Sequence, residues 1–246
     1  MSKQKGKIFI GTSGWHYKHW TGTFYPGTIK GSRQFDEYKK SFDTVEINNS
    51  FYKLPAEKTL KQWTLAAPKD FIYAVKASRY ITHLKKLDVE IDSISLLLSR
   101  MDILEEKLGP ILFQLPPGFV VNIKRLKTFL EKIPYGYRYA FEFRNVSWYT
   151  KDVLELLKQH NCAFCIYELA GHISPKEVTA DFVYIRLHGP GDKYQGSYSI
   201  ETLRKWASDC KIWMNNGLDV YVYFDNDQEG FAAFNALTLK TLISIR

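Results

Sequence analysis

The amino-acid sequence predicts an α/β protein built as a single (β/α)8 barrel of the TIM type, one domain over residues 1–246. Eight short runs rich in β-branched and aromatic residues are spaced along the chain, and segments with helical periodicity separate them. This alternation is typical of parallel strands joined by helices. Several of the runs also alternate polar and apolar residues, whereas the strands of an open parallel sheet are apolar throughout. Both observations favour a barrel.

The predicted elements follow one another in order. The strands are expected at residues 8–13, 44–48, 72–78, 111–115, 139–144, 163–168, 182–188 and 219–226. The helices are expected at residues 32–42, 57–66, 92–108, 122–133, 150–160, 199–216 and 229–245. Asn122, Thr150 and Ser199 are typical N-caps, and Gly109 and Gly217 are typical helix ends. Residues 171–179 have weak helical character, so we expect a degenerate sixth helix.

The alternation is clearest in the seventh predicted strand. Val183, Ile185 and Leu187 form its apolar set, and polar side chains stand between them. One face of such a strand packs against helices and the other faces a polar barrel interior.

Polar side chains of the inward phase gather near the carboxyl ends of the predicted strands, where barrels of this type carry their active sites. They are Ser13, Glu46, Asn48, Lys76, Gln114, Glu142, Arg144, Glu168, Arg186, His188 and Asp225. Burying unpaired charge is costly, so this pattern predicts a ligand-binding mouth. The alternative is that some of these charges pair with one another and only hold the barrel closed.

The mouth predicts acid/base chemistry on a small polar, anionic ligand such as a phosphorylated compound, by hydrolysis or isomerisation. Glu142, Glu46 and His188 are the candidate catalytic residues, since crowded carboxylates and a histidine supply acids and bases. Arg144 lies on the same strand face as Glu142 and is expected to keep it ionised. Arg144, Arg186 and Lys76 are the expected anion partners. A structural hydrogen-bonding role is the alternative for His188.

The sequence identifies no cofactor and predicts no metal site. A metal-assisted phosphoesterase is a variant that would take its ligands from Glu46, Glu142, Glu168, His188 and Asp225. It has thin support, since such sites commonly recruit more than one histidine.

Two loops of the predicted mouth carry further hypotheses. Residues 189–197 are glycine-rich and contain Lys193, which is typical of a phosphate cradle, with an ordinary connection as the alternative. Residues 14–31 are rich in aromatic residues, which either stack on a ligand or pack on one another as a lid.

Charge and cysteine content bear on partners and compartment. The formal net charge is +8, with 34 basic and 26 acidic residues, which raises nucleic-acid binding as an alternative function. The basic residues are spread along the chain, which favours a solvated basic shell. Three cysteines, including the pair Cys162 and Cys165, predict inert buried thiols and a cytoplasmic location. We expect no signal peptide or membrane span, and the oligomeric state stays open.

Several short motifs together resemble the YecE-like family, called domain of unknown function 72. They are Gly11-Thr12-Ser13-Gly14-Trp15, Trp20-x-Gly22-x-Phe24-Tyr25-Pro26, Val45-Glu46-Ile47-Asn48, Ser50-Phe51-Tyr52, Gln114-Leu115-Pro116-Pro117, Glu142-x-Arg144, Arg186-x-His188-Gly189 and Tyr223-Phe224-x-Asn226. The resemblance implies a TIM-type barrel but no catalytic role, because the family's activity is unassigned. The motif positions add Trp15, Gly189 and Asn226 to the candidate ligand-binding residues. A barrel without catalysis, serving as a scaffold, is a third hypothesis.

Overall fold

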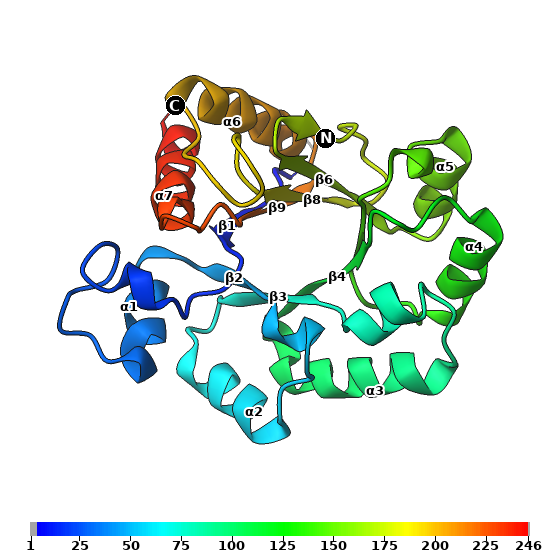
Figure 1. The fold of residues 1–246 in the computed structure, drawn as a ribbon, viewed down its shortest axis with the longest axis horizontal. Helices are drawn as coiled ribbons and strands as arrows, with labels where there is room; N and C mark the ends of the chain where they lie inside the picture. The colour runs from blue at the N-terminus through cyan, green and yellow to red at the C-terminus, as the bar shows by residue number, and fades with distance from the viewer. Residues whose placement is uncertain (1–3, 246) are drawn as a thin grey trace. The chain divides into compact units, whose positions relative to one another are not determined.

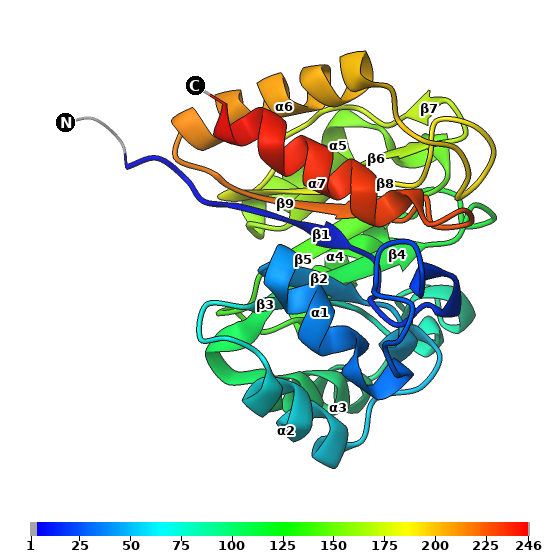
Figure 2. The same ribbon diagram turned by 90° about the vertical axis from the view of Figure 1, so that its left-hand side faces the viewer.

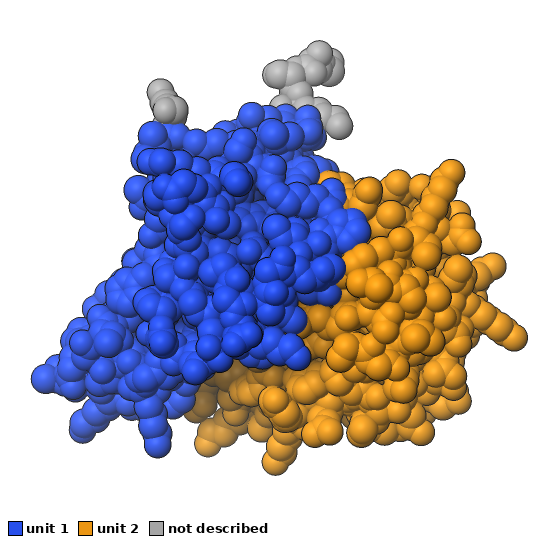
Figure 3. Space-filling model, turned by 45° about the horizontal axis from the view of Figure 1, so that its top comes forward, with its two compact units in different colours: residues 1–46, 166–176, 181–246 blue, residues 47–165, 177–180 orange. Residues whose placement is uncertain are grey.

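The computed structural model describes residues 4–245, and the chain divides into two compact units (Figure 3). Unit 1 comprises residues 1–46, 166–176 and 181–246, and unit 2 comprises residues 47–165 and 177–180. Residues 1–3 and 246, which the predicted single domain includes, lie outside the described range. The single domain itself stays a prediction.

The connectivity alternates parallel strands with helices (Figure 1). The strands are β1 (Ile8–Thr12), β2 (Thr44–Ile47), β3 (Ile72–Lys76), β4 (Leu108–Leu115), β5 (Tyr139–Phe143), β6 (Ala163–Leu169), β7 (His172–Ile173), β8 (Phe182–Leu187) and β9 (Asp219–Phe224). Hydrogen bonding orders them β1-β9-β8-β6-β5-β4-β3-β2, with β7 paired to β6. This is the order of a (β/α)8 fold of the TIM type and confirms the predicted class.

Seven α-helices and six shorter helical segments connect the strands of the described chain. The α-helices are α1 (Gln34–Ser41), α2 (Glu57–Ala66), α3 (Ile91–Met101), α4 (Ile123–Lys132), α5 (Lys151–Gln159), α6 (Ile200–Asn215) and α7 (Phe231–Ser244). The shorter segments are η1 (Lys18–Trp20), η2 (Gly31–Arg33), η3 (Asn49–Phe51), η4 (Tyr80–Leu84), η5 (Asp102–Lys107) and η6 (Val146–Trp148). The predicted N-caps are confirmed: Asn122, Thr150 and Ser199 each accept a backbone N–H three residues ahead.

In unit 1, α6 and α7 lie side by side against β9, and α7 also packs on β1 (Figure 2). Strands β1, β9 and β8 pair in register, with Ile10 beside Val222 and Val222 beside Ile185. These side chains are buried, as the alternation predicts. The polar side chains that alternate with them on the same strands therefore point to the opposite face, where the candidate site lies.

In unit 2, the apolar phase of the strands packs on aromatic side chains. Phe113 of β4 stacks on Phe141 of β5 with ring centroids 5.2 Å apart, and Phe129 of α4 meets Phe113 edge-on at 5.1 Å. Gln114 and Glu142 are register partners in the opposite phase. The period of two thus puts these two polar side chains on one face.

The predicted helix over residues 92–108 is wrong at its end. Regular helix α3 stops at Met101, η5 follows, and Glu105 has a φ of 54°, which breaks the helix. Gly109 lies inside β4 instead of ending a helix. β4 approaches β3 so closely here that only glycine fits, because an added Cβ would stand 2.5 Å from Cγ2 of Ile72.

The degenerate sixth helix is confirmed. The described backbone between β6 and β8 forms β7 and otherwise runs without regular structure. Hydroxyl groups supply hydrogen bonds there: within unit 1 Ser174 accepts the Tyr167 N–H at 2.9 Å, and within unit 2 Thr179 accepts the Phe164 N–H at 2.7 Å. These contacts fasten the segment to β6 without a helix.

Within residues 4–245, no helix is both long enough and apolar enough to cross a membrane.

Candidate functional site

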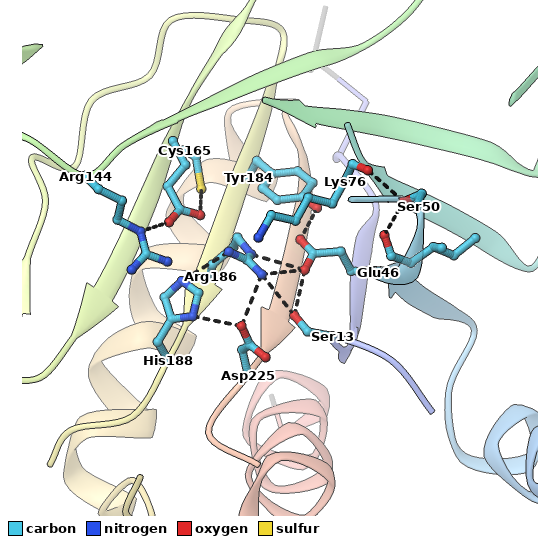
Figure 4. Close-up of polar contacts among 12 residues, drawn as sticks. Ser13, Glu46, Ser50, Lys76, Arg144, Cys165, Tyr184, Arg186, His188 and Asp225 are labelled. Atoms are coloured by element: carbon cyan, nitrogen blue, oxygen red, sulfur yellow. Dashed lines mark hydrogen bonds and ion pairs between the residues drawn. The ribbon is translucent and has the colours of Figure 1, made fainter. Parts of the chain in front are cut away.

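In unit 1, a buried ion pair joins Glu46 of β2 to Arg186 of β8 (Figure 4). Arg186 Nη2 lies 2.7 Å from Glu46 Oε1, which also accepts the Ser13 hydroxyl at 2.7 Å. The Tyr184 hydroxyl donates to Glu46 Oε2 at 2.6 Å. Glu46 is 0% and Arg186 1% exposed, so the ion pair is sealed from solvent. Both oxygens of Glu46 are thus occupied by groups of the protein itself.

The same arginine reaches a second carboxylate, that of Asp225. Arg186 Nη2 lies 3.2 Å and His188 Nδ1 3.0 Å from Asp225 Oδ2. Nε2 of His188 lies 3.4 Å from Arg186 Nη1, and because a guanidinium only donates, this nitrogen is an acceptor. The proton of a neutral His188 is therefore on Nδ1, toward Asp225. The Asp225 side chain is 17% exposed, whereas that of His188 is 0% exposed.

Aromatic rings cover His188. Tyr167 and Tyr194 meet the imidazole edge-on, with ring centroids at 6.2 and 5.5 Å. In this arrangement His188 makes structural hydrogen bonds, and its acid/base role stays a prediction. Asp225 is the group of this network through which solvent has access.

In unit 2, Glu142 of β5 forms an ion pair with Arg144, two residues further along (Figure 4). The predicted neighbourhood is therefore confirmed. Glu142 is fully buried and the Arg144 side chain is 9% exposed. Cys165 Sγ lies 3.9 Å from the other carboxylate oxygen of Glu142. The pair presents its guanidinium, more than its carboxylate, toward solvent.

A cationic cluster, defined here as Lys76, Arg79 and Arg144 around His83, occupies the carboxyl ends of β3 and β5 in unit 2. The pKa of His83 is lowered to about 4 by burial, and then by the charges of Lys76, Arg79 and Arg144. Lys76 Nζ also stands 4.4 Å from the centroid of the Phe51 ring. At neutral pH His83 is therefore uncharged among three cations.

Sequence analysis missed His83 and Arg79. Both follow β3 in the connection to α3, and His83 lies in η4, a single π-helical turn. Strand phase selects side chains only up to the strand end, so it stops at Lys76. The spacing of basic residues at 76, 79 and 83, directly after a strand, is the signal that was available.

Glu168, predicted to line the mouth, faces elsewhere. Its carboxylate accepts the Trp206 indole N–H from α6 at 3.1 Å, and burial raises its pKa. Tyr167, one residue earlier, takes the phase that points to His188. Because strand side chains alternate, only one of two neighbours can face inward.

Trp15 and Asn48, also predicted to bind the ligand, follow the ends of β1 and β2. Trp15 packs on Phe35 with ring centroids 5.3 Å apart. Asn48 precedes η3, and its Oδ1 is buried without a hydrogen-bond partner among the described residues. Their ligand-binding roles stay predictions.

The glycine-rich loop after β8 is shaped by internal contacts. Gly189 has a φ of +110°, and an added Cβ would stand 2.2 Å from the Gln195 carbonyl oxygen. The Gly189 N–H donates to the Tyr198 hydroxyl at 2.9 Å. Asn226 Nδ2 donates to the Gly196 carbonyl at 2.9 Å and to Asn235 at 2.8 Å. Gly189 and Asn226 therefore have structural roles, and the phosphate cradle stays a prediction.

The aromatic segment after β1 packs largely on itself, which favours the second of its two interpretations. Trp20 and Tyr25 are buried with ring centroids 5.4 Å apart. Trp20 Nε1 donates to Asp227 Oδ1 at 2.7 Å, and His19 Nε2 lies 2.9 Å from Asp227 Oδ2. Asp227, in the turn after β9, thus fastens the segment, a role that strand phase does not predict.

The metal-ligating side chains and thiols of residues 4–245 lie as follows. No group of three or more His, Cys, Asp and Glu side chains is placed there to hold a metal ion. Cys162, Cys165 and Cys210 are buried thiols outside any disulfide, as predicted, and burial raises the pKa of Cys162 to about 12.

A family model described as "Protein of unknown function DUF72" matches residues 9–246. The chain belongs to the DUF72 family. This confirms the resemblance seen in the sequence motifs. The match runs from β1 to the end of α7, through both units.

Relatives of this DUF72 chain carry no assigned activity in their names. It is 24% identical to the UPF0759 protein YunF of Bacillus subtilis, over 97% of this chain and 95% of that one. It is 28% identical to the UPF0759 protein YecE of Escherichia coli K12, over 58% of this chain and 51% of that one. A crystal structure of a DUF72 protein from Thermotoga maritima superposes with a TM-score of 0.84 at 26% identity, covering 96% of this chain and 99% of that one.

Asp227 of this DUF72 protein is expected to titrate near pH 6, because burial raises its pKa to about 6 while contacts with Trp20 and His19 oppose the rise. At pH values between the ordinary pKa of an aspartate and about 6, folding adds a proton to Asp227. The part of the free energy of unfolding that comes from the protonated carboxyl is therefore lost as pH rises through about 6. The Trp20 indole N–H resonance reports the titration in ¹H–¹⁵N spectra.

The internal control is the Trp148 indole, which donates to the Phe119 carbonyl at 2.6 Å and so faces no titrating acceptor. The chemical shift of the Trp148 indole N–H should not change with pH. The Asp227→Asn substitution should abolish the pH-dependent change in the chemical shift of the Trp20 indole N–H. A Trp20 signal that does not move between pH 5 and 7 would contradict the assignment.

Proposed function

We propose that this protein binds a small anion of the phosphate class at the cationic cluster of unit 2, and that Glu142 acts there as an acid/base group. The cationic cluster carries the proposal. The combined positive charge of Lys76, Arg79 and Arg144 acts on His83, and Arg144 also forms an ion pair with Glu142. A phosphate would offset this charge with charge-assisted hydrogen bonds.

The position of the cluster supports a ligand site. Lys76 ends β3 and Arg144 follows β5, so both stand at the strand ends where barrels of this type bind ligands. Both side chains are partly exposed. The network around Glu46 in unit 1 differs, since its central pair, Glu46 and Arg186, is 0% and 1% exposed and is bonded to other groups of the protein.

Glu142 is the acid/base group that this proposal favours. It is bound to Arg144 through one carboxylate oxygen, and an anion held by that guanidinium would lie beside the carboxylate. Hydrolysis and isomerisation both use a carboxylate so placed. Glu46 is less suited, because Ser13, Tyr184 and Arg186 occupy its oxygens.

We also propose a reducing, cytoplasmic compartment. The three cysteines form no disulfide, which suits a reducing compartment.

The test is titration of inorganic phosphate into the purified protein by calorimetry. Lys76→Met should weaken phosphate binding roughly tenfold or more, the usual effect of losing one charge-assisted hydrogen bond. Rising ionic strength should weaken binding in the wild type.

Lys69→Met is the matched control, because Lys69 is exposed and precedes the amino end of the same strand, β3. It should bind phosphate like the wild type. The proposal fails if the wild type binds no phosphate, or if both lysine variants lose binding equally.

A further inference from the structure

An exposed aromatic residue adjoins the cationic cluster. Tyr52 follows η3 and is 74% exposed. Its ring meets that of Phe51 edge-on, with centroids 5.0 Å apart. Lys76 Nζ lies 4.4 Å from the centroid of the Phe51 ring, and the centroid of the His83 ring lies 4.8 Å from it. The tyrosine ring, the lysine ammonium and the imidazole thus surround one phenylalanine within unit 2.

This arrangement is held by its own hydrogen bonds. The Ser50 hydroxyl lies 2.7 Å from the Lys76 carbonyl and 3.1 Å from the Ile47 carbonyl, so it ties η3 to the end of β3. The Tyr52 N–H donates to the Asn49 carbonyl at 3.1 Å. The backbone that carries Tyr52 is therefore fixed beside the cations. Its ring stays open to solvent, with 74% of the residue exposed.

Aromatic rings kept in solvent next to cations suit one class of anion. Inorganic phosphate has no face to stack on a tyrosine and a sugar phosphate has no planar ring, whereas a nucleotide offers a planar base for stacking and a phosphate for the cations. The Phe51 ring has Lys76 Nζ and the Tyr52 ring within 5.0 Å of its centroid, so both lie within reach of one bound molecule.

We propose that the anion bound by the cationic cluster is a nucleotide, whose base stacks on Tyr52 and whose phosphate is held by Lys76 and Arg144. This inference rests on the proposed function and narrows its ligand class. Lys76 and Arg144 set the affinity for the phosphate, and Tyr52 sets the preference for a base.

The experiment compares three probes by calorimetry: adenosine 5′-monophosphate, ribose 5-phosphate and inorganic phosphate. The nucleotide should bind roughly tenfold or more tightly than ribose 5-phosphate, which matches the usual gain from stacking one base. Tyr52→Ala should bring the nucleotide down to the affinity of ribose 5-phosphate and leave ribose 5-phosphate unchanged. Tyr52→Phe should keep the preference, because it keeps the ring.

Tyr135→Ala is the matched control. Tyr135 is also a tyrosine of unit 2, is 87% exposed, and lies before the amino end of β5. Its loss should change none of the three affinities.

The outcomes separate this inference from the proposed function. If phosphate and ribose 5-phosphate bind but the nucleotide gains nothing, or if Tyr52→Ala weakens all three probes alike, the nucleotide inference is overturned and the anion site stands. If no probe binds, both are overturned. A final arm uses a single-stranded oligothymidylate: if it binds and the mononucleotide does not, the ligand is nucleic acid and the inference is again overturned.

Discussion

Replacing Arg186 by methionine is expected to lower the free energy of unfolding by about 3–5 kcal/mol, the usual cost of removing one partner from a buried ion pair. Arg186 is 1% exposed and bonds to the carboxylates of Glu46 and Asp225. Methionine keeps much of the volume but removes the charge. Glu46, which is fully buried, would then lack its cation and keep only the neutral donors Ser13 and Tyr184.

Urea denaturation measures the loss. The double variant Arg186→Met/Glu46→Gln should recover a large part of it, because the stranded charge is removed as well. Arg204→Met, on the exposed side of α6 in the same unit, serves as the control and should change stability by less than about 0.5 kcal/mol. An Arg186→Met protein as stable as this control would show that the ion pair carries no net stability.

The sequence left two explanations for charged residues at the strand ends: a ligand site, or charges that pair with one another. The paired charges of unit 1 and the cationic cluster of unit 2 bear on these explanations separately. Glu46 and Arg186 satisfy each other inside the protein, which is the structural explanation of charge at strand ends. In unit 2 the charges of Lys76, Arg79 and Arg144 all act on His83. The same sequence pattern thus includes a structural ion pair in unit 1 and, in unit 2, the cationic cluster for which ligand binding is proposed.

Strand phase is the reason that the face on which these polar side chains lie was predictable. Side chains on a strand alternate strictly, so Glu46, Arg186, Glu142 and Arg144 could be assigned to one face from the sequence alone. The same rule explains the error at Glu168. Its neighbour Tyr167 faces inward, and which of two adjacent large residues does so depends on packing against α6 that no period reveals.

Loop residues were beyond the reach of this rule. His83 and Arg79 join Lys76 only because η4 turns back after β3, and Asp227 meets His19 only because two segments some 200 residues apart fold together. Neither approach is encoded in a local period. The Gly109 error has a similar origin, since a contact with β3, and not local helix signals, decides its conformation.

Arg144→Met is expected to have two separable effects. It should lower the free energy of unfolding by about 2–4 kcal/mol, because Glu142 is fully buried and would lose its ion-pair partner. It should also weaken phosphate binding at least tenfold if Arg144 is a ligand group. A loss of binding in this variant alone would be ambiguous, since a destabilised site also binds poorly.

The double variant Glu142→Gln/Arg144→Met resolves this ambiguity. Glutamine removes the stranded charge and keeps the size of the side chain, so stability measured in urea should return most of the way to the wild type. Phosphate binding should stay weak, because the guanidinium is still missing. Glu142→Gln alone should bind phosphate at least as tightly as the wild type, since a competing negative charge has been removed. If the double variant binds phosphate like the wild type, Arg144 is a structural partner of Glu142 and the anion is held by other groups.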